Sequence, residues 1–159
     1  NRCAVDDFTS IFDATSRTFF ITGVQMETGA TATDFESRSY GEELALCQRY
    51  YFRLTPSATG ESLGIGNHNS TTSSQTTTFF PVNMRIPPTA LEQSGTATDY
   101  SVIAAGSPVV CSAVPVFAPS NTSTALITLT VASGLTTGDG TRSRAANGTA
   151  SYLAWSAEL

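Results

Sequence analysis

The chain has 159 residues, a length that suits one compact domain with a short additional segment. Charged residues make up only 13%, and thirteen acids outweigh eight arginines, giving a net charge of −5. Binding to nucleic acid or to an anionic membrane relies on clustered basic side chains, and a membrane span needs about 20 apolar residues in a row, so neither nucleic-acid binding nor membrane insertion is expected.

The N-terminal part shows the alternation of apolar and polar residues that is typical of β-strands. A short strand is expected near Val5–Phe12 and a longer one over Arg17–Glu27. In the longer strand Phe19 and Ile21 would share one face, and Phe20 would lie on the other.

One helix is expected next. Ser39-Tyr40-Gly41-Glu42 matches the S-x-x-E capping box, in which serine and glutamate side chains satisfy the free backbone donors at a helix start. The helix would run through Cys47, with Leu44, Cys47 and Tyr51 on one stripe. From Arg49 the pattern favours a strand that follows the helix directly and ends near Leu54.

Two stretches rich in Gly, Asn, Ser and Thr are expected to be exposed loops. The first is Gly60–Thr78, apart from a short strand candidate at Leu63–Ile65. The second is Gly134–Gly148, where Asp139-Gly140 and Asn147-Gly148 favour tight turns.

The second half of the chain is dominated by strand patterns. Val109–Phe117 is apolar on both faces, which indicates either a central strand or one covered by a neighbouring subunit. Many short strands with one short α-helix predict an all-β fold, an antiparallel β-sandwich of the jelly-roll kind. The remaining strand candidates are Phe79–Ile86, Tyr100–Ala104, Ser123–Val131 and Thr149–Ala157.

Cys3, Cys47 and Cys111 cannot all pair within one chain, and none lies at a metal-ligand spacing. Buried free thiols in a protein assembled in a reducing cytoplasm are the simplest interpretation, while a Cys47–Cys111 bridge stays open. No metal and no other cofactor is expected.

Catalytic activity is not expected either. A nucleophilic Cys47 would need a base, and His68, the only histidine, lies in a predicted loop without an orienting partner. A glycosidase needs two carboxyl groups opposed across a sugar at about 5–9 Å. The adjacent acids Asp6-Asp7 would point to opposite faces of a strand, and Glu42 of the pair Glu42-Glu43 belongs to the capping box.

The predicted loops carry the residue types that bind sugars. Amide, hydroxyl and imidazole groups exchange hydrogen bonds with sugar hydroxyls, arginines meet acidic glycans, and Tyr50, Tyr51 or Phe79 offers an aromatic face for a pyranose. The alternative is that these loops are solvated and have no ligand. The candidate ligand-binding residues are Asn67, His68, Asn69, Arg142 and Arg144.

Three motifs resemble those of a known group of proteins. They are GVQMETGATATDFE (Gly23–Glu36), YGEELALCQRYY (Tyr40–Tyr51) and PVNMRIPPT (Pro81–Thr89). In order and spacing they are similar to the signature of bacteriophage tail-fibre and virion surface proteins, in which leucine is usual at the position of Met26 and proline at that of Asp34. The resemblance extends over about residues 17–159.

This resemblance implies a β-sandwich virion domain over residues 17–159, without enzymatic activity and assembled in the bacterial host cytoplasm. Residues 1–16 would be the remnant of a preceding module or an N-terminal extension, since the chain starts at Asn1 as a fragment or processed product would. The implied partners are two further copies in a homotrimer, other phage structural proteins and a host cell-surface polysaccharide. Two functions follow: a receptor-binding fibre or knob domain, and alternatively a capsid-decorating or cement protein with a purely structural role.

Overall fold

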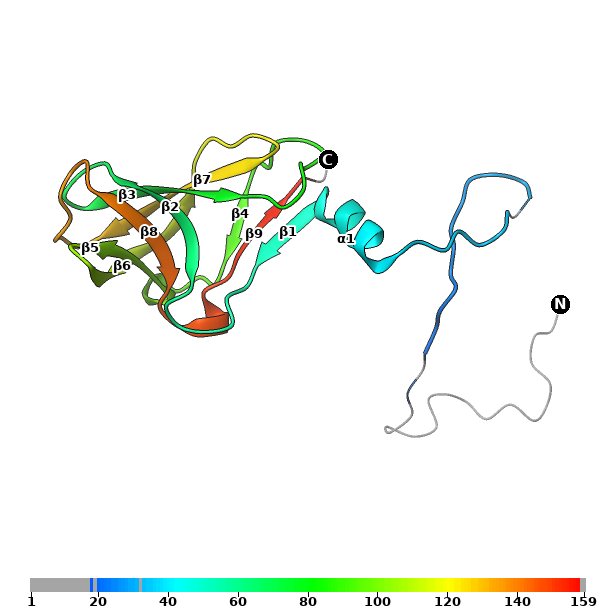
Figure 1. Ribbon diagram of the computed structural model, residues 1–159, viewed down its shortest axis with the longest axis horizontal. Helices are drawn as coiled ribbons and strands as arrows, with labels where there is room; N and C mark the ends of the chain where they lie inside the picture. The colour runs from blue at the N-terminus through cyan, green and yellow to red at the C-terminus, as the bar shows by residue number, and fades with distance from the viewer. Residues whose placement is uncertain (1–17, 19, 32, 158–159) are drawn as a thin grey trace. The chain divides into compact units, whose positions relative to one another are not determined.

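The computed structural model describes residues 18, 20–31 and 33–157, so the predicted strand Val5–Phe12 lies outside the described part. The chain divides into two units, one up to Arg38 and one from Ser39 onward. Two short 3-10 helices, η1 (Ala97–Asp99) and η2 (Gly148–Ala150), accompany the main elements of Figure 1. The main elements are α1 (Tyr40–Gln48), β1 (Tyr51–Leu54), β2 (Ser62–His68), β3 (Ser73–Phe79), β4 (Leu91–Gln93), β5 (Tyr100–Ala104), β6 (Ser107–Phe117), β7 (Thr124–Val131), β8 (Gly140–Ala145) and β9 (Leu153–Ser156).

The first unit contains no helix or strand in its described residues, so the prediction of a strand over Arg17–Glu27 is wrong where it can be checked. In place of the backbone hydrogen bonds of a β-ladder, this segment has hydrogen bonds that involve side chains. The Glu27 carboxylate accepts hydrogen bonds from Thr33 N over 2.6 Å and from Thr33 Oγ1 over 2.5 Å. Gln25 Oε1 accepts from Glu36 N over 2.8 Å. The large apolar side chains among the described residues of this unit are exposed, so a strand there would have no face to bury.

Helix α1 begins as the sequence predicts. Glu42 N donates to Ser39 Oγ over 3.3 Å, and Ser39 N donates to the Glu42 carboxylate over 3.0 Å, which completes the capping box. No residue of α1 is buried, so the predicted stripe through Leu44 and Cys47 is not part of the core. No helix in the described residues is long and apolar enough to cross a membrane.

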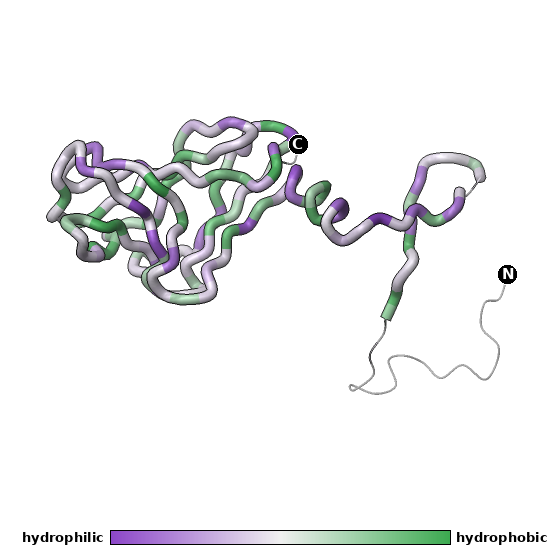
Figure 2. The backbone as a smooth tube through the Cα atoms, viewed as in Figure 1, coloured by the Kyte–Doolittle hydropathy of each residue, from purple (hydrophilic) through white to green (hydrophobic). Residues whose placement is uncertain are grey.

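Six strands form a closed antiparallel barrel in the order β2-β3-β7-β6-β5-β8. The prediction of an all-β antiparallel fold with one α-helix is confirmed, whereas the sandwich or jelly-roll grouping is not. Strand β7 confirms the strand predicted over Ser123–Val131, and its alternate residues Ala125, Ile127, Leu129 and Val131 all point into the barrel and are buried. Figure 2 shows hydrophobic residues interspersed with weakly polar ones along the strands, without long hydrophobic runs.

Strands β2, β3 and β8 close the barrel, and they come from the segments that the sequence predicts to be loops. Both loop predictions, Gly60–Thr78 and Gly134–Gly148, are wrong over these strands, whereas the strand candidate Leu63–Ile65 lies within β2 and is confirmed. The reason is that small hydroxyl residues fill this side of the interior: Thr76 Oγ1 donates to Ser143 Oγ over 3.0 Å, and Thr78 Oγ1 donates to the Leu63 carbonyl over 2.8 Å. Because these buried hydroxyl groups are hydrogen-bonded within the protein, their burial does not leave them without the hydrogen bonds that water would supply.

The three-stranded sheet β1-β9-β4 closes one side of the core. Trp155 of β9 is fully buried, stacks on Phe52 of β1 with ring centroids 6.1 Å apart, and meets Phe80 edge-on at 5.5 Å. The predicted strand Phe79–Ile86 is wrong beyond Phe79, which ends β3. Phe80 and Met84 are nevertheless buried, with their backbone N–H groups bonded to the carbonyls of the segment before β7.

Candidate functional site

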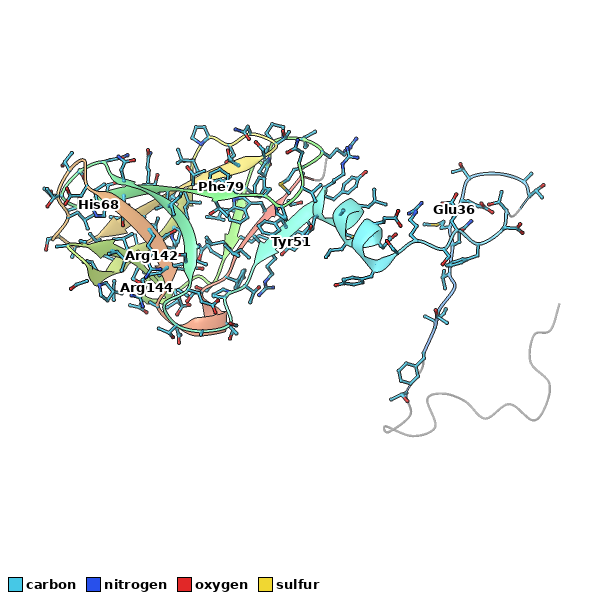
Figure 3. The ribbon with its side chains drawn as sticks, in the orientation of Figure 1. Glu36, Tyr51, His68, Phe79, Arg142 and Arg144 are labelled. Atoms are coloured by element: carbon cyan, nitrogen blue, oxygen red, sulfur yellow. The ribbon has the colours of Figure 1, made fainter. Side chains whose placement is uncertain are left out.

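The outer surface of the barrel carries a groove of about 740 Å³. Its residues come from four strands that follow one another around the closed barrel, in the order β3-β2-β8-β5. Figure 3 shows Phe79, Arg142 and Arg144 on this part of the barrel. The lining residues are Ile65, Gly66, Thr77, Phe79, Ile103, Gly140, Thr141 and Arg142.

Strand register explains why these residues meet. Ile65 of β2 pairs with Thr77 of β3 on one side and with Arg142 of β8 on the other. Since side chains alternate along a strand and His68 points inward, Ile65 points outward. Ile65 is 60% exposed and Phe79 is 64% exposed, so the groove has an apolar, partly aromatic wall open to solvent.

The polar side of the groove is formed by β8. Arg142 Nη1 donates to Ser62 Oγ over 3.2 Å. Arg144, two residues further on the same outward face, pairs in register with Ser62 and Ser101. Its Nη2 lies 2.9 Å from the position that a Cβ on Gly60 would occupy, so the guanidinium packs directly over the Gly60 backbone.

Neither arginine of β8 is neutralised by a neighbouring acid. Within the described residues no carboxylate lies within ion-pair distance of Arg142 or Arg144. Among the described residues, the Nε atom of Arg144 is buried and has no hydrogen-bond partner. Strand β8 therefore presents two positive charges, Arg142 in the groove and Arg144 beside it, that no ion pair within the described residues compensates.

The structure places the sequence-predicted ligand residues in two groups. Arg142 lines the groove and Arg144 lies beside it, both on a strand and not in a loop as expected. Asn67 and Asn69 are exposed near the β2–β3 turn, with Asn67 Nδ2 and Asn69 Oδ1 3.4 Å apart. They do not line the groove.

The expectation of an exposed His68 is wrong. His68 is 0% exposed, and its Nε2 lies 3.2 Å from the Ile103 carbonyl oxygen inside the barrel. The alternation of β2 turns this side chain inward, so a ligand at the surface does not reach it. Among the three suggested aromatic residues, Phe79 lines the groove, whereas the Tyr51 hydroxyl donates to Glu92 over 3.2 Å on the three-stranded sheet (Figure 3).

The arrangement suits a polar ring with one hydrophobic face. Phe79 and Ile65 offer a surface on which the C–H face of a sugar can pack. Thr141 Oγ1 donates to the Ile103 carbonyl over 2.8 Å and accepts from Ile103 N over 3.2 Å, so one lone pair of this oxygen is left for a ligand. The described residues contain no group of His, Cys, Asp and Glu that could hold a metal ion.

The two described cysteines are both free. Cys47 is exposed and Cys111 is buried, so the alternative of a Cys47–Cys111 bridge is wrong. Burial raises the pKa of the Cys111 thiol to about 12. That thiol therefore stays protonated inside the barrel wall at neutral pH.

Comparisons with protein-family models, with curated protein sequences and with solved structures found no match for this chain. The groove and the three sequence motifs are therefore the grounds for assigning a function.

Proposed function

We propose that this chain is a non-enzymatic binding module of a bacteriophage particle, a homotrimeric fibre or knob domain on the virion surface whose barrel groove contacts a host surface glycan. The observation that carries the glycan contact is the groove, in which Phe79 and Arg142 lie on one surface. The phage assignment rests on the resemblance of the three sequence motifs. The sandwich-type virion module implied by that resemblance would here consist of the barrel together with the three-stranded sheet.

Sugar binding at such a site has a simple physical basis. An exposed aromatic ring beside an aliphatic side chain gains by covering its surface with the apolar face of a pyranose. The hydroxyl groups of Thr77 and Thr141 stand at the same groove and match the sugar hydroxyls. One shallow site of this kind binds weakly, and several copies on one particle raise the overall affinity.

Exposed apolar side chains support self-association. Val110 and Val116 of β6 are 49% and 56% exposed. A soluble protein gains by covering such surface with a partner. In this proposal two further copies supply the cover, and other phage structural proteins attach at the ends of the trimer.

A capsid-decorating or cement protein is the second candidate. The same exposed valines of β6 favour it, because they can lie against a capsid subunit as well as against a second copy. In that case the groove would have no glycan ligand.

The deciding measurement is the solution mass by light scattering together with a screen of bacterial surface glycans. The proposal expects a mass of three times 16.7 kDa and binding to at least one glycan. Phe79→Ala should abolish that binding, while Tyr40→Ala, which removes an exposed ring from α1, should leave it unchanged. A monomer that binds no glycan would contradict the proposal and favour the decoration protein.

A further inference from the structure

We infer that the groove selects acidic glycans, with the carboxylate of a uronic or sialic acid unit held by Arg142 and Arg144 while its ring lies against Phe79. This inference rests on the proposed function, because it names the chemical class of sugar that the same groove takes.

The two arginines of β8 place positive charge on a chain that is acidic overall. The chain carries a net charge of −5, yet β8 places two arginines on one face, two residues apart. Residues two apart on one face of a strand have Cα atoms about 7 Å apart, so like charges at these positions repel each other, and an anion bound between them reduces that repulsion. Two other arginines have neighbouring partners: Arg38 pairs with Glu36 at 2.9 Å, and Arg53 lies 3.9 Å over the ring of Tyr152.

Geometry is the second argument. Arg142 uses one terminal nitrogen on Ser62 Oγ, which leaves most of its planar donor fork free. The Arg144 guanidinium packs over Gly60, and its buried Nε atom has no hydrogen-bond partner within the described residues. A guanidinium fork matches the two oxygens of a carboxylate and forms paired, charge-assisted hydrogen bonds with it.

The apolar wall strengthens this recognition. Ile65, Phe79 and Ile103 line the same groove as Arg142. A sugar ring that covers them excludes water from the guanidinium, and electrostatic attraction grows as the local dielectric falls. An acidic sugar contacts both the apolar wall, through its ring, and the arginines, through its carboxylate. A free anion contacts only the arginines.

The test is a titration of the full chain by isothermal calorimetry with oligosaccharides of polygalacturonate and polysialate. Matched ligands are the carboxyl-reduced forms of the same oligosaccharides, inorganic phosphate and a teichoic acid. The inference expects binding of at least one carboxylated sugar that weakens with salt, and no binding of its reduced form. Arg142→Gln and Arg144→Gln should each weaken binding by about tenfold or more.

The control variant is Arg85→Gln, which removes an exposed arginine from a different part of the chain and should leave the affinity unchanged. Arg142→Lys keeps the charge without the fork and should retain part of the affinity. Both β8 side chains point outward, so thermal melting by circular dichroism should show that all the variants fold.

The remaining outcomes separate the two proposals. Equal binding of acidic and reduced sugars, lost with Phe79→Ala but not with Arg142→Gln, would overturn the acidic selectivity and keep the proposed function. Binding of teichoic acid or phosphate as strong as that of the carboxylated sugars would overturn the carboxylate assignment. If no sugar of either kind binds, both proposals fail.

Discussion

Replacing Gly66 with alanine tests the close approach of β2 and β3 that shapes the groove. A Cβ at this position would lie 1.8 Å from the Gln75 carbonyl oxygen and 2.8 Å from the Gln75 carbonyl carbon and the Thr76 Cα. These are backbone atoms of the neighbouring strand and cannot rotate away. The two strands must therefore separate where Gly66 pairs with Thr76.

The size of the effect follows from that separation. The contact must open from 1.8 Å to the 3.4 Å at which ordinary contact begins, a shift of about 1.6 Å. Overpacking of this kind costs about 1–3 kcal/mol. The shift also breaks about two ladder hydrogen bonds, at about 1 kcal/mol each. We expect Gly66→Ala to lower the free energy of unfolding by about 3–5 kcal/mol, and the Tm by roughly 10 °C.

Gly140→Ala is the matched control. Gly140 lines the same groove and starts β8, but a Cβ there would meet nothing within 4 Å. Because alanine loses less conformational freedom on folding than glycine, this variant should be as stable as the parent or slightly more stable. Urea unfolding followed by the fluorescence of the single tryptophan, Trp155, measures both variants. Equal stabilities of the two variants would refute the close strand approach.

Three further predictions concern the core. Trp155→Ala should cost about 3–5 kcal/mol in urea unfolding followed by circular dichroism, because it empties a fully buried site stacked on Phe52; a cost under about 1 kcal/mol would contradict that packing. In a Cys3→Ser background, a thiol reagent at pH 8 should modify exposed Cys47 at once and buried Cys111 only after unfolding, as peptide mass spectrometry will show. Burial raises the pKa of Cys111 to about 12, above its ordinary value of 9.0, so unfolding favours ionisation and the free energy of unfolding should fall as pH rises from 9 towards 12. A Cys111→Ala variant, which lacks that thiol, should show a smaller fall.

The sequence predicts those parts of the fold in which local pattern and burial agree. The capping box at Ser39 fixes the start of α1, and alternating aliphatic residues fix β7. Strand β5 occupies the predicted range Tyr100–Ala104. Strand β3 could not be predicted in this way, because its inward side chains are Ser and Thr hydroxyls, which bond to Ser143 Oγ of β8 and to the Leu63 carbonyl. Such a pattern resembles that of a solvated loop.

The candidate site was only partly predictable for a related reason. Phe79 and Arg142 each carry a recognisable binding chemistry, but they are far apart in sequence and meet only through the register of β3, β2 and β8. Ile65, which lies between them, stands in a glycine-rich stretch that gives no sign of a surface role. The inward position of His68 likewise depends on its strand, because the residue type alone favours exposure as much as burial.

The order of the strands has a consequence for synthesis on the ribosome. Strand β8 closes the barrel between β2 and β5, and β9 is the central strand between β1 and β4. Until these two late strands emerge, a nascent chain exposes unpaired edges on both of its sheets, and such edges invite association with other chains. Neither the closed barrel nor the three-stranded sheet can be completed by a chain that stops before Gly140. Only a chain that has been translated through Ser156 can therefore complete both sheets.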